Sequence, residues 1–226
     1  MISPMKQAFA LIFDMDGVIA DTGDFHEKAW FIFCENHKIP ITSKLFRDKL
    51  FGMSNRETLK ILFDREITDE EFRRFVKEKE NLFRNLASET LKPLKGLLKF
   101  LNEARKAGFD MAVASSAPLE NIIFVLEKTR TGVFFDQITS ADEIVNSKPH
   151  PEIFLKTAQK LNYQPQNCFV FEDSFAGIQA GNSAGMKVIG VASTHKIAEL
   201  NNTLFNISNF DEINVQKLHH LFEGST

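Results

Sequence analysis

Residues 8–17 combine a short apolar run with two aspartates, and this combination constrains the fold more than any other part of the chain. The run from Ala8 to Phe13 has the length and character of a β-strand buried on both faces. Because a carboxylate is costly to bury, Asp14 and Asp16 are expected at the carboxyl end of this strand, where ligands bind in open α/β sheets. One aspartate there could attack an electrophile while the other handles a proton. The alternative is a strand followed by an ordinary acidic turn.

The composition is that of a globular protein with a substantial core. The 226 residues are 43% hydrophobic and 25% charged, with a formal net charge of −3, so nucleic acid is not an expected partner. No apolar run approaches the roughly 18 residues of a membrane helix, so no membrane partner is expected. The first residues lack the apolar stretch of a signal peptide, and we expect a cytoplasmic protein. Nothing in the sequence demands more than a monomer.

Apolar strand-like runs alternate with helix-like segments through most of the chain. Such alternation predicts an α/β fold with a Rossmann-like parallel sheet that is covered by helices on both faces. The 23 phenylalanines indicate packing in its core. The expected strands are 8–13, 110–114, 137–139, 168–171, 187–191 and 204–207, and the expected helices are 96–107, 118–128, 151–161 and 174–184.

Residues 22–90 interrupt this alternation, because they contain several helical patterns and no convincing strand. Ser54 and Thr68 are each followed three residues later by glutamate, the pattern of a capping box at the start of a helix. The sequence therefore predicts a helical-bundle cap domain, inserted after the first strand as a lid over its carboxyl end. The expected boundaries are 1–20 with 91–226 for the core domain and 21–90 for the cap domain.

Two segments carry groups suited to binding an anion. Ser115 and Ser116 follow a predicted strand, where a hydroxyl and the next backbone N–H groups can hold an anion, although serine there is commonly only a turn residue. Lys148 lies in a loop that two prolines stiffen, just before a predicted helix. Its ammonium group could neutralise an anionic ligand, and the alternative is a solvated loop lysine.

A second pair of acids repeats the design of the first strand. Glu172 and Asp173 directly follow the predicted strand 168–171, and together with Asp14 they offer the hard oxygen ligands that Mg²⁺ prefers. Acids before a helix also serve as simple N-caps. The repetition of the arrangement at two strands favours a metal site.

Together these segments resemble the haloacid-dehalogenase-like phosphotransferases, in the branch that carries a helical cap after the first strand. Within that branch the chain is similar to β-phosphoglucomutases and to sugar-phosphate phosphatases. The resemblance covers nearly the whole chain, and it rests on the combination of motifs because no single one is specific. The motifs are Phe-Asp-Met-Asp-Gly-Val at 13–18, Ala-Ser-Ser at 114–116, Ser-Lys-Pro-His-Pro at 147–151 and Phe-Glu-Asp-Ser-Phe-Ala-Gly-Ile-Gln-Ala-Gly at 171–181.

The resemblance implies a role for each of these residues. Asp14 would attack phosphorus to form an aspartyl phosphate, and Asp16 would protonate the leaving alkoxide and then deprotonate the incoming hydroxyl. Because dehalogenases of this fold lack the second aspartate, Asp16 indicates phosphoryl transfer. The phosphoryl oxygens would be bound by Ser115, Ser116 and Lys148. The Mg²⁺ ligands would be Asp14, the backbone carbonyl of Asp16, Asp173 and, directly or through water, Glu172.

The predicted cap gives a mixed indication between a phosphatase and a mutase. His26 and Trp30 lie four residues apart on one helix and match the mutases, as does Lys79 in a segment that resembles a sugar-contacting one. A surface histidine and a lysine that extends to water are the alternatives. Asn55 stands where the mutases carry the arginine that grips a second phosphate, and Arg56 is shifted by one position around the helix.

Two further differences weaken the likeness to the mutases. Phe51 replaces a basic residue of the cap loop, and Ala117-Pro118 replaces a substrate-contacting Ser-Lys pair. We therefore expect a Mg²⁺-dependent phosphatase that hydrolyses a small phosphorylated metabolite such as a sugar phosphate. The alternative enzyme is a β-phosphoglucomutase that interconverts β-glucose 1-phosphate and glucose 6-phosphate. A sensor of phosphorylated metabolites that retains the fold without catalysis is a third hypothesis.

Overall fold

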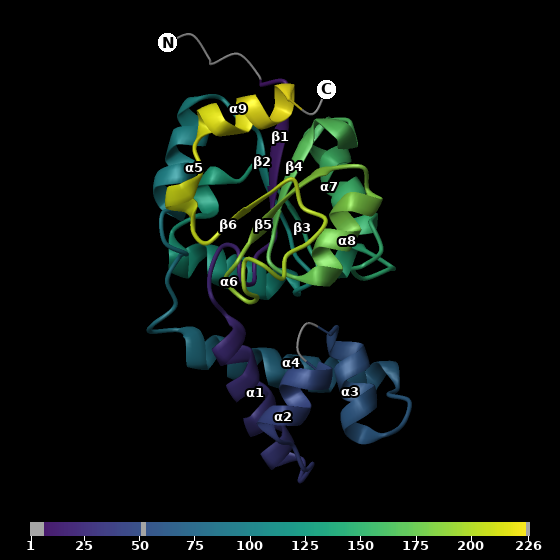
Figure 1. The fold of residues 1–226 in the computed structure, drawn as a ribbon. Coiled ribbons are helices and arrows are strands. Elements are labelled where there is room, and N and C mark those ends of the chain that lie inside the picture. The colour runs from purple at the N-terminus through teal and green to yellow at the C-terminus, as the bar shows by residue number, and fades with distance from the viewer. Residues whose placement is uncertain (1–6, 51–52, 225–226) are drawn as a thin grey trace. The chain divides into compact units, whose positions relative to one another are not determined.

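The computed structural model of this protein describes residues 7–50 and 53–224, which form two compact units (Figure 1). The chain leaves and re-enters the first unit at adjacent points, because Ala20 pairs with Pro93 in an antiparallel bridge. The units are Met1–Asp21 with Lys92–Thr226 and, inserted between them, Thr22–Leu91.

The first unit is built on a six-stranded sheet in the order β3-β2-β1-β4-β5-β6, in which every neighbouring pair is parallel. The α/β class and the parallel sheet are as predicted. The strands are β1 Ala10–Phe13, β2 Met111–Ala114, β3 Gln137–Thr139, β4 Cys168–Glu172, β5 Lys187–Val191 and β6 Phe205–Ile207.

Helices cover both faces of this sheet, with α7 and α8 on one side and α5 and α9 on the other (Figure 1). The helices are α1 Gly23–Asn36, α2 Ser43–Leu45, α3 Asn55–Phe63, α4 Asp69–Ala87, α5 Leu97–Lys106, α6 Leu119–Thr129, α7 Glu152–Leu161, α8 Phe175–Ser183 and α9 Val215–Glu223. The short turns are the π-helical η1 Phe46–Leu50 and the 3₁₀-helical η2 Gly132–Phe134, η3 Ala141–Glu143, η4 Pro165–Asn167 and η5 Phe210–Glu212.

Side chains alternate along β1 between two hydrophobic layers, as expected for a strand covered on both faces. Ile12 packs in the cluster that contains Ile153 of α7 and Ile178 of α8. Phe13 points the other way and stacks on Phe171 of β4, with ring centroids 4.6 Å apart. The many phenylalanines therefore serve packing, as the composition indicates.

The inserted unit is helical over its described residues, as its sequence predicts. Both capping boxes form: the side chains of Ser54 and Thr68 accept hydrogen bonds from the backbone N–H groups of Glu57 and Glu71, which reciprocate. The apolar faces of α1 and α4 pack together around a core that includes Phe33. That this unit acts as a lid stays a prediction.

One helix of the first unit was not predicted. This helix is α9, Val215–Glu223. Asn214 is its N-cap, and the Asn214 side chain accepts a hydrogen bond from the backbone N–H of Lys217. Leu218 is the one buried residue of this helix, but Val215, Leu218 and Phe222 recur at helical spacing, so the sequence carries an apolar stripe that our prediction missed. Within the described residues, every helix is too short or too polar to span a lipid bilayer.

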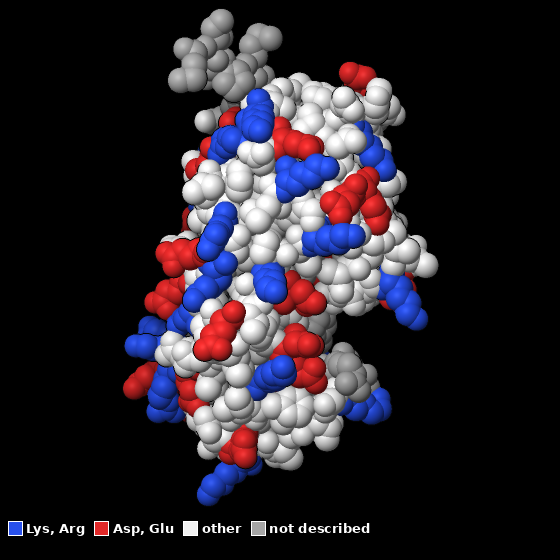
Figure 2. Space-filling model, turned by 90° about the vertical axis from the view of Figure 1, so that its left-hand side faces the viewer, with Lys and Arg blue, Asp and Glu red and all other residues white. Residues whose placement is uncertain are grey.

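The surface carries charges of both signs. On the face shown in Figure 2, Lys and Arg side chains are interspersed with Asp and Glu, and no large area of one sign stands out. This distribution agrees with the small net charge of −3.

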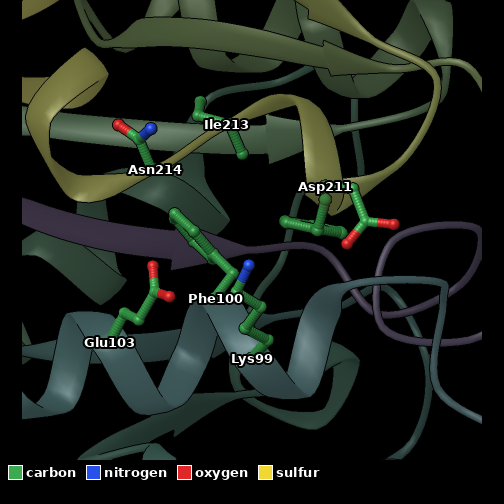
Figure 3. Close-up of a pocket in the computed structure, with 7 residues that line it drawn as sticks. Lys99, Phe100, Glu103, Asp211, Ile213 and Asn214 are labelled. Carbon is green, nitrogen blue, oxygen red and sulfur yellow. The ribbon is translucent and has the colours of Figure 1, made fainter.

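A small pocket lies between α5 and the segment around η5 (Figure 3). Its lining contains none of the residues that the sequence singles out for chemistry. Phe100 and Phe210, which belong to the aromatic layer under β1 and β4, form part of its wall. The lining residues are Lys99, Phe100, Glu103, Phe210, Asp211, Ile213 and Asn214.

Replacing Phe100 with alanine is expected to lower the free energy of unfolding by about 3–5 kcal/mol, because a fully buried ring leaves a cavity against Phe13 and Phe171. Chemical denaturation followed by circular dichroism measures the change. Phe175→Ala is the matched control, because Phe175 is 52% exposed. This substitution should lower the free energy of unfolding by less than about 1 kcal/mol. Equal losses for the two variants would contradict the assigned packing.

Candidate active site

Because all six strands are parallel, their carboxyl ends meet at one edge of the sheet. Strands β2 and β4 flank β1 on either side, which places a topological switch point beside the end of β1. Asp14 follows β1, and its backbone N–H donates to the carbonyl of Phe171 in β4 at 3.0 Å. Glu172 ends β4 and Asp173 follows it. The topology thus brings together the two acidic motifs predicted from distant parts of the chain.

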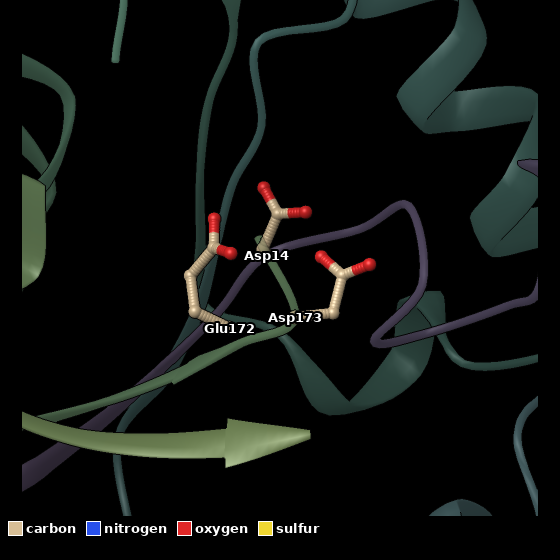
Figure 4. Close-up of side chains that lie close together, drawn as sticks. All are labelled: Asp14, Glu172 and Asp173. Carbon is tan, nitrogen blue, oxygen red and sulfur yellow. The ribbon is translucent and has the colours of Figure 1, made fainter. Parts of the chain in front are cut away.

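Three carboxylates form a compact cluster at this edge (Figure 4). One oxygen from each of Asp14, Glu172 and Asp173 lies within 4.8 Å of the others. Their side chains belong to residues only 7%, 1% and 6% exposed, respectively. An ordinary acidic turn would be solvated, so the burial contradicts that alternative for Asp14.

Lys148 lies between the carboxylates and bridges two of them. Its Nζ donates to Asp14 Oδ1 at 2.5 Å and to Glu172 Oε1 at 2.6 Å, and the Ala114 carbonyl at 3.4 Å is a third acceptor. The ammonium group also lies 4.8 Å from the centroid of the Phe154 ring. Lys148 is therefore a fixed cation at the ends of β1, β2 and β4, and the alternative of a solvated loop lysine is wrong.

One ammonium group cannot neutralise three buried carboxylates, and the pKa values reflect this imbalance. Burial raises the pKa of Asp14 to about 8, with repulsion from Glu172 adding to the effect and the ion pair to Lys148 opposing it. Burial and the negative charges of Glu172 and Asp14 likewise raise the pKa of Asp173. Burial alone would lower the pKa of Lys148, but its ion pairs with Asp14 and Glu172 raise it.

The turn after β4 holds Glu172 from a second side. The backbone N–H and the hydroxyl of Ser174 both donate to Glu172 Oε2, at 2.8 and 2.9 Å. Ser174 is also the N-cap of α8, because its hydroxyl accepts from the Gly177 backbone N–H. The alternative that Glu172 and Asp173 cap this helix is therefore wrong. A Cβ atom on Gly177 would overlap the Glu172 carboxylate, so a glycine is required there.

The remaining predicted residues of this edge lie nearby but differ in exposure. Ser115 follows β2, is 1% exposed, and its Oγ accepts from the backbone N–H of Ala117 at 3.1 Å. Ser116 is exposed. Asp16 is half-buried, and its backbone forms a bridge with Ala20 that holds the turn after β1.

The cluster fits a divalent cation. Three ionised carboxylates and one ammonium group leave two negative charges in a buried place, which is the charge that a divalent ion neutralises. All the candidate ligand atoms are hard oxygens, the type that Mg²⁺ prefers. The structure thus supports a metal site here without specifying the metal.

Comparison with known proteins identifies the family. The family model for haloacid dehalogenase-like hydrolases matches residues 11–191, a span that contains all four motifs. The chain belongs to the haloacid dehalogenase-like hydrolases. The membership expected from the motifs is thereby confirmed, and so is the expectation of an enzyme.

Individual relatives within the family carry two kinds of name. The chain is 36% identical over 184 residues to a phosphorylated carbohydrates phosphatase of Thermotoga maritima, covering 80% of this chain and 83% of that protein. It is 32% identical over 190 residues to a β-phosphoglucomutase of Bacillus subtilis, covering 80% and 82%. A crystal structure of β-phosphoglucomutase from Clostridium difficile matches with a TM-score of 0.84 and 32% identity, covering 96% of this chain and 97% of that one.

A second polar cluster lies inside the helical unit and contains several predicted cap residues. Lys79 is 3% exposed, and its Nζ lies 2.8 Å from His26 Nδ1 and 3.0 Å from Glu80 Oε1. Asn55 donates to the same Glu80 oxygen at 2.8 Å. The lysine Nζ lies 5.3 Å from the centroid of the Trp30 ring. Lys79 therefore does not extend to bulk water, and that alternative is wrong.

Arg56 does not join this cluster. Its guanidinium group donates to the exposed Asp69 at 2.9 Å and lies 4.1 Å from the centroid of the Phe72 ring. The shift by one position from Asn55 therefore directs Arg56 to a different partner. Phe51, the other residue of the predicted cap loop, lies outside the described residues.

Sequence reasoning missed several residues that hold the acidic cluster in place. Ser174 and Gly177 stand inside a motif that the sequence analysis quoted, but neither was given a role. The Thr194 hydroxyl donates to Asp173 Oδ2, and the Ser193 hydroxyl donates to the carbonyl of Gly17. Ser193 and Thr194 follow β5 at the same edge of the sheet. Their position just after a predicted strand is the one sequence feature that could have indicated a role at the site.

Gly177→Ala is expected to lower phosphatase activity strongly, because the new methyl group overlaps the Glu172 carboxylate and must displace it. Alanine normally stabilises a helix interior by about 1 kcal/mol relative to glycine, so a loss cannot be attributed to helix propensity. Initial rates with p-nitrophenyl phosphate measure the effect. Gly132→Ala is the control, since its Cβ would meet only Leu126 at an ordinary 3.5 Å. Unchanged activity in Gly177→Ala would contradict the assigned packing.

The metal-free protein is expected to lose stability as the pH rises between about 5 and 8. The pKa of Asp14 is about 8 in the folded protein, well above the ordinary value of an unfolded aspartate. Such a group stabilises the folded state while it is protonated, and this stabilisation is lost as the pH rises toward the folded-state pKa. The raised pKa of Lys148 acts only at higher pH. Thermal unfolding in a chelator should show the decline, and Asp14→Asn should reduce it. A cation replaces the proton, so added Mg²⁺ should stabilise most at high pH; a flat profile in chelator would contradict this account.

Proposed function

We propose that this protein is a Mg²⁺-dependent phosphatase that hydrolyses a small phosphorylated metabolite, most simply a sugar monophosphate, through an aspartyl-phosphate intermediate. The observation that carries the proposal is the buried carboxylate of Asp14 at a strand end, paired with Lys148 and grouped with Glu172 and Asp173. A nucleophilic carboxylate must approach an anionic phosphate, and fixed positive charge at that point offsets the repulsion.

The chemistry divides into two displacements. In the first, a carboxylate oxygen of Asp14 attacks phosphorus, the phosphorus–oxygen bond to the metabolite breaks, and Asp16 gives its proton to the leaving alkoxide. In the second, Asp16 takes a proton from water, whose oxygen attacks phosphorus and releases phosphate from Asp14. The proton count closes, because Asp16 is protonated again at the end of the cycle.

The other residues of the sheet edge bind charge. Lys148 and Ser115 would contact the phosphoryl oxygens, with the exposed Ser116 beside them. The Mg²⁺ would be held by Asp14, the Asp16 backbone carbonyl and Asp173, with Glu172 contributing directly or through water. When bound, the ion neutralises charge on the transferring phosphoryl group and lowers the pKa of Asp14.

The polar cluster of the helical unit supports a substrate with a single phosphate. Burial acts to raise the pKa of Glu80, but the charges of Lys79 and His26 and the hydrogen bonds from Asn55 and Lys79 together outweigh burial and lower that pKa. The cation of Lys79 is thus already paired with an anion, and Asn55 is uncharged. A second phosphate group would need a cation that this cluster does not offer. The similarity to a protein named as a phosphorylated carbohydrates phosphatase supports a phosphorylated carbohydrate as the substrate class.

A β-phosphoglucomutase is the second candidate, because two of the relatives carry that name and His26 and Lys79 match the mutases. Incubation with β-glucose 1-phosphate and a trace of the bisphosphate separates the two. A phosphatase should release inorganic phosphate at the rate at which substrate disappears. Rapid formation of glucose 6-phosphate with little free phosphate would overturn the phosphatase proposal. A panel of sugar phosphates, assayed for phosphate release, would then identify the substrate.

Asp16→Asn is expected to lower kcat for a sugar phosphate by about 10²–10⁴-fold, because the alkoxide leaves without a proton. With p-nitrophenyl phosphate, whose leaving group needs no proton, the first step should remain fast. The variant should then release one equivalent of p-nitrophenolate in a burst, followed by slow turnover. Stopped-flow absorbance measures the burst. Asp14→Asn should show neither burst nor turnover, and equal activity of Asp14→Asn and the wild type would contradict catalysis at this site.

A further inference from the structure

The loop that follows β5 contacts both acidic motifs, although neither the four motifs nor the proposed mechanism includes it. The Thr194 hydroxyl donates to Asp173 Oδ2, which is one of the candidate ligand groups. The neighbouring Ser193 hydroxyl donates to the carbonyl of Gly17, three residues after Asp14. Adjacent residues of one loop therefore tie the turn after β1 to the turn after β4.

The side chain of Asp173 is confined from a second direction by Gly17. A Cβ atom on Gly17 would overlap Asp173 Oδ2 and would lie 3.0 Å from the Ser193 hydroxyl oxygen. The backbone at Gly17 has φ +70°, a conformation that favours glycine. Oδ2 of Asp173 thus lies between the Gly17 backbone and the Thr194 hydroxyl, which leaves the carboxylate little room to turn.

We propose that Thr194 is a positioning residue for the metal site, which fixes the Asp173 carboxylate by occupying Oδ2 and presents Oδ1 to a divalent cation. Threonine suits this role, because its branched side chain has few rotamers and its hydroxyl donates a hydrogen bond to a carboxylate. Ser193 supports it by holding the carbonyl of Gly17. The inference rests on the proposed function only in that Asp173 is taken as a metal ligand.

The test compares Mg²⁺ binding by Thr194→Val, which keeps the shape and removes the hydroxyl, with binding by Thr194→Ser, which keeps the hydroxyl. Partners that orient metal ligands typically contribute 10–100-fold to affinity, so Thr194→Val should bind Mg²⁺ at least about 10-fold more weakly and Thr194→Ser close to normally. The rise of the thermal unfolding midpoint with Mg²⁺ concentration measures binding without relying on turnover. Thr194→Ala removes the same hydroxyl by a second route.

Activity supplies a separate readout. Because Thr194 acts through Asp173, saturating Mg²⁺ should restore kcat in Thr194→Val, while the Mg²⁺ concentration for half-activation rises and KM for substrate does not. Thr203→Val is the matched control: it removes a hydroxyl that donates to Asn206 at 2.7 Å in the same unit and should leave Mg²⁺ affinity unchanged.

Asp173→Asn separates failure of this inference from failure of the proposed function. If Asp173→Asn loses Mg²⁺ affinity while Thr194→Val binds as the wild type does, the role of Thr194 is overturned and the metal site stands. An equal loss in Thr194→Ser and Thr194→Val would also overturn it, because the hydroxyl would not be the determinant. Normal Mg²⁺ binding by Asp173→Asn would overturn the metal site and the inference together.

Discussion

Repulsion among three buried carboxylates is the constraint on which the rest of this site depends. Asp14, Glu172 and Asp173 face one another with Lys148 as the cation that bridges two of them. Without further positive charge, burial and this repulsion raise the pKa of Asp14 to about 8, which favours a protonated cluster below that pH. A divalent ion would replace that proton and free the carboxylate. The same imbalance that opposes burial therefore makes the site responsive to a cation, and a bound divalent cation would remove the net negative charge that repels an anionic phosphate.

Holding like charges together requires a rigid support, and the sheet provides it. Asp14 and Glu172 stand at the ends of paired strands, whose neighbouring rings Phe13 and Phe171 are stacked beneath them. The hydrogen bond from the Asp14 backbone to the Phe171 carbonyl continues the pairing beyond the strand. Side chains placed on strand ends over a packed aromatic layer keep their geometry better than side chains on free loops.

Features that depend on a few consecutive residues could be predicted from the sequence, and so could the grouping of the two acidic motifs, because the ends of parallel strands meet at one edge of the sheet. Individual contacts between side chains distant in the sequence could not be predicted. The capping boxes at Ser54 and Thr68 need only four residues each, and both formed as predicted. The hydrogen bond between Thr194 and Asp173 exists because β5 lies beside β4, which no local pattern encodes. The burial of Lys79 could not be predicted either, because it depends on a contact with His26, 53 residues away in the sequence.

The two units carry different parts of the chemistry. The strand ends of the first unit hold the groups to which we assign the displacement of a phosphoryl group, and these groups lie in the four motifs quoted from the sequence. The helical unit holds an internally neutralised pair, Lys79 and Glu80, with the uncharged Asn55 bound to the same carboxylate. In such a cluster a change of one residue alters net charge without touching the nucleophile. Under the proposed function, selection between a monophosphate and a bisphosphate would be able to change in the helical unit while the displacement chemistry proposed for Asp14 stays the same.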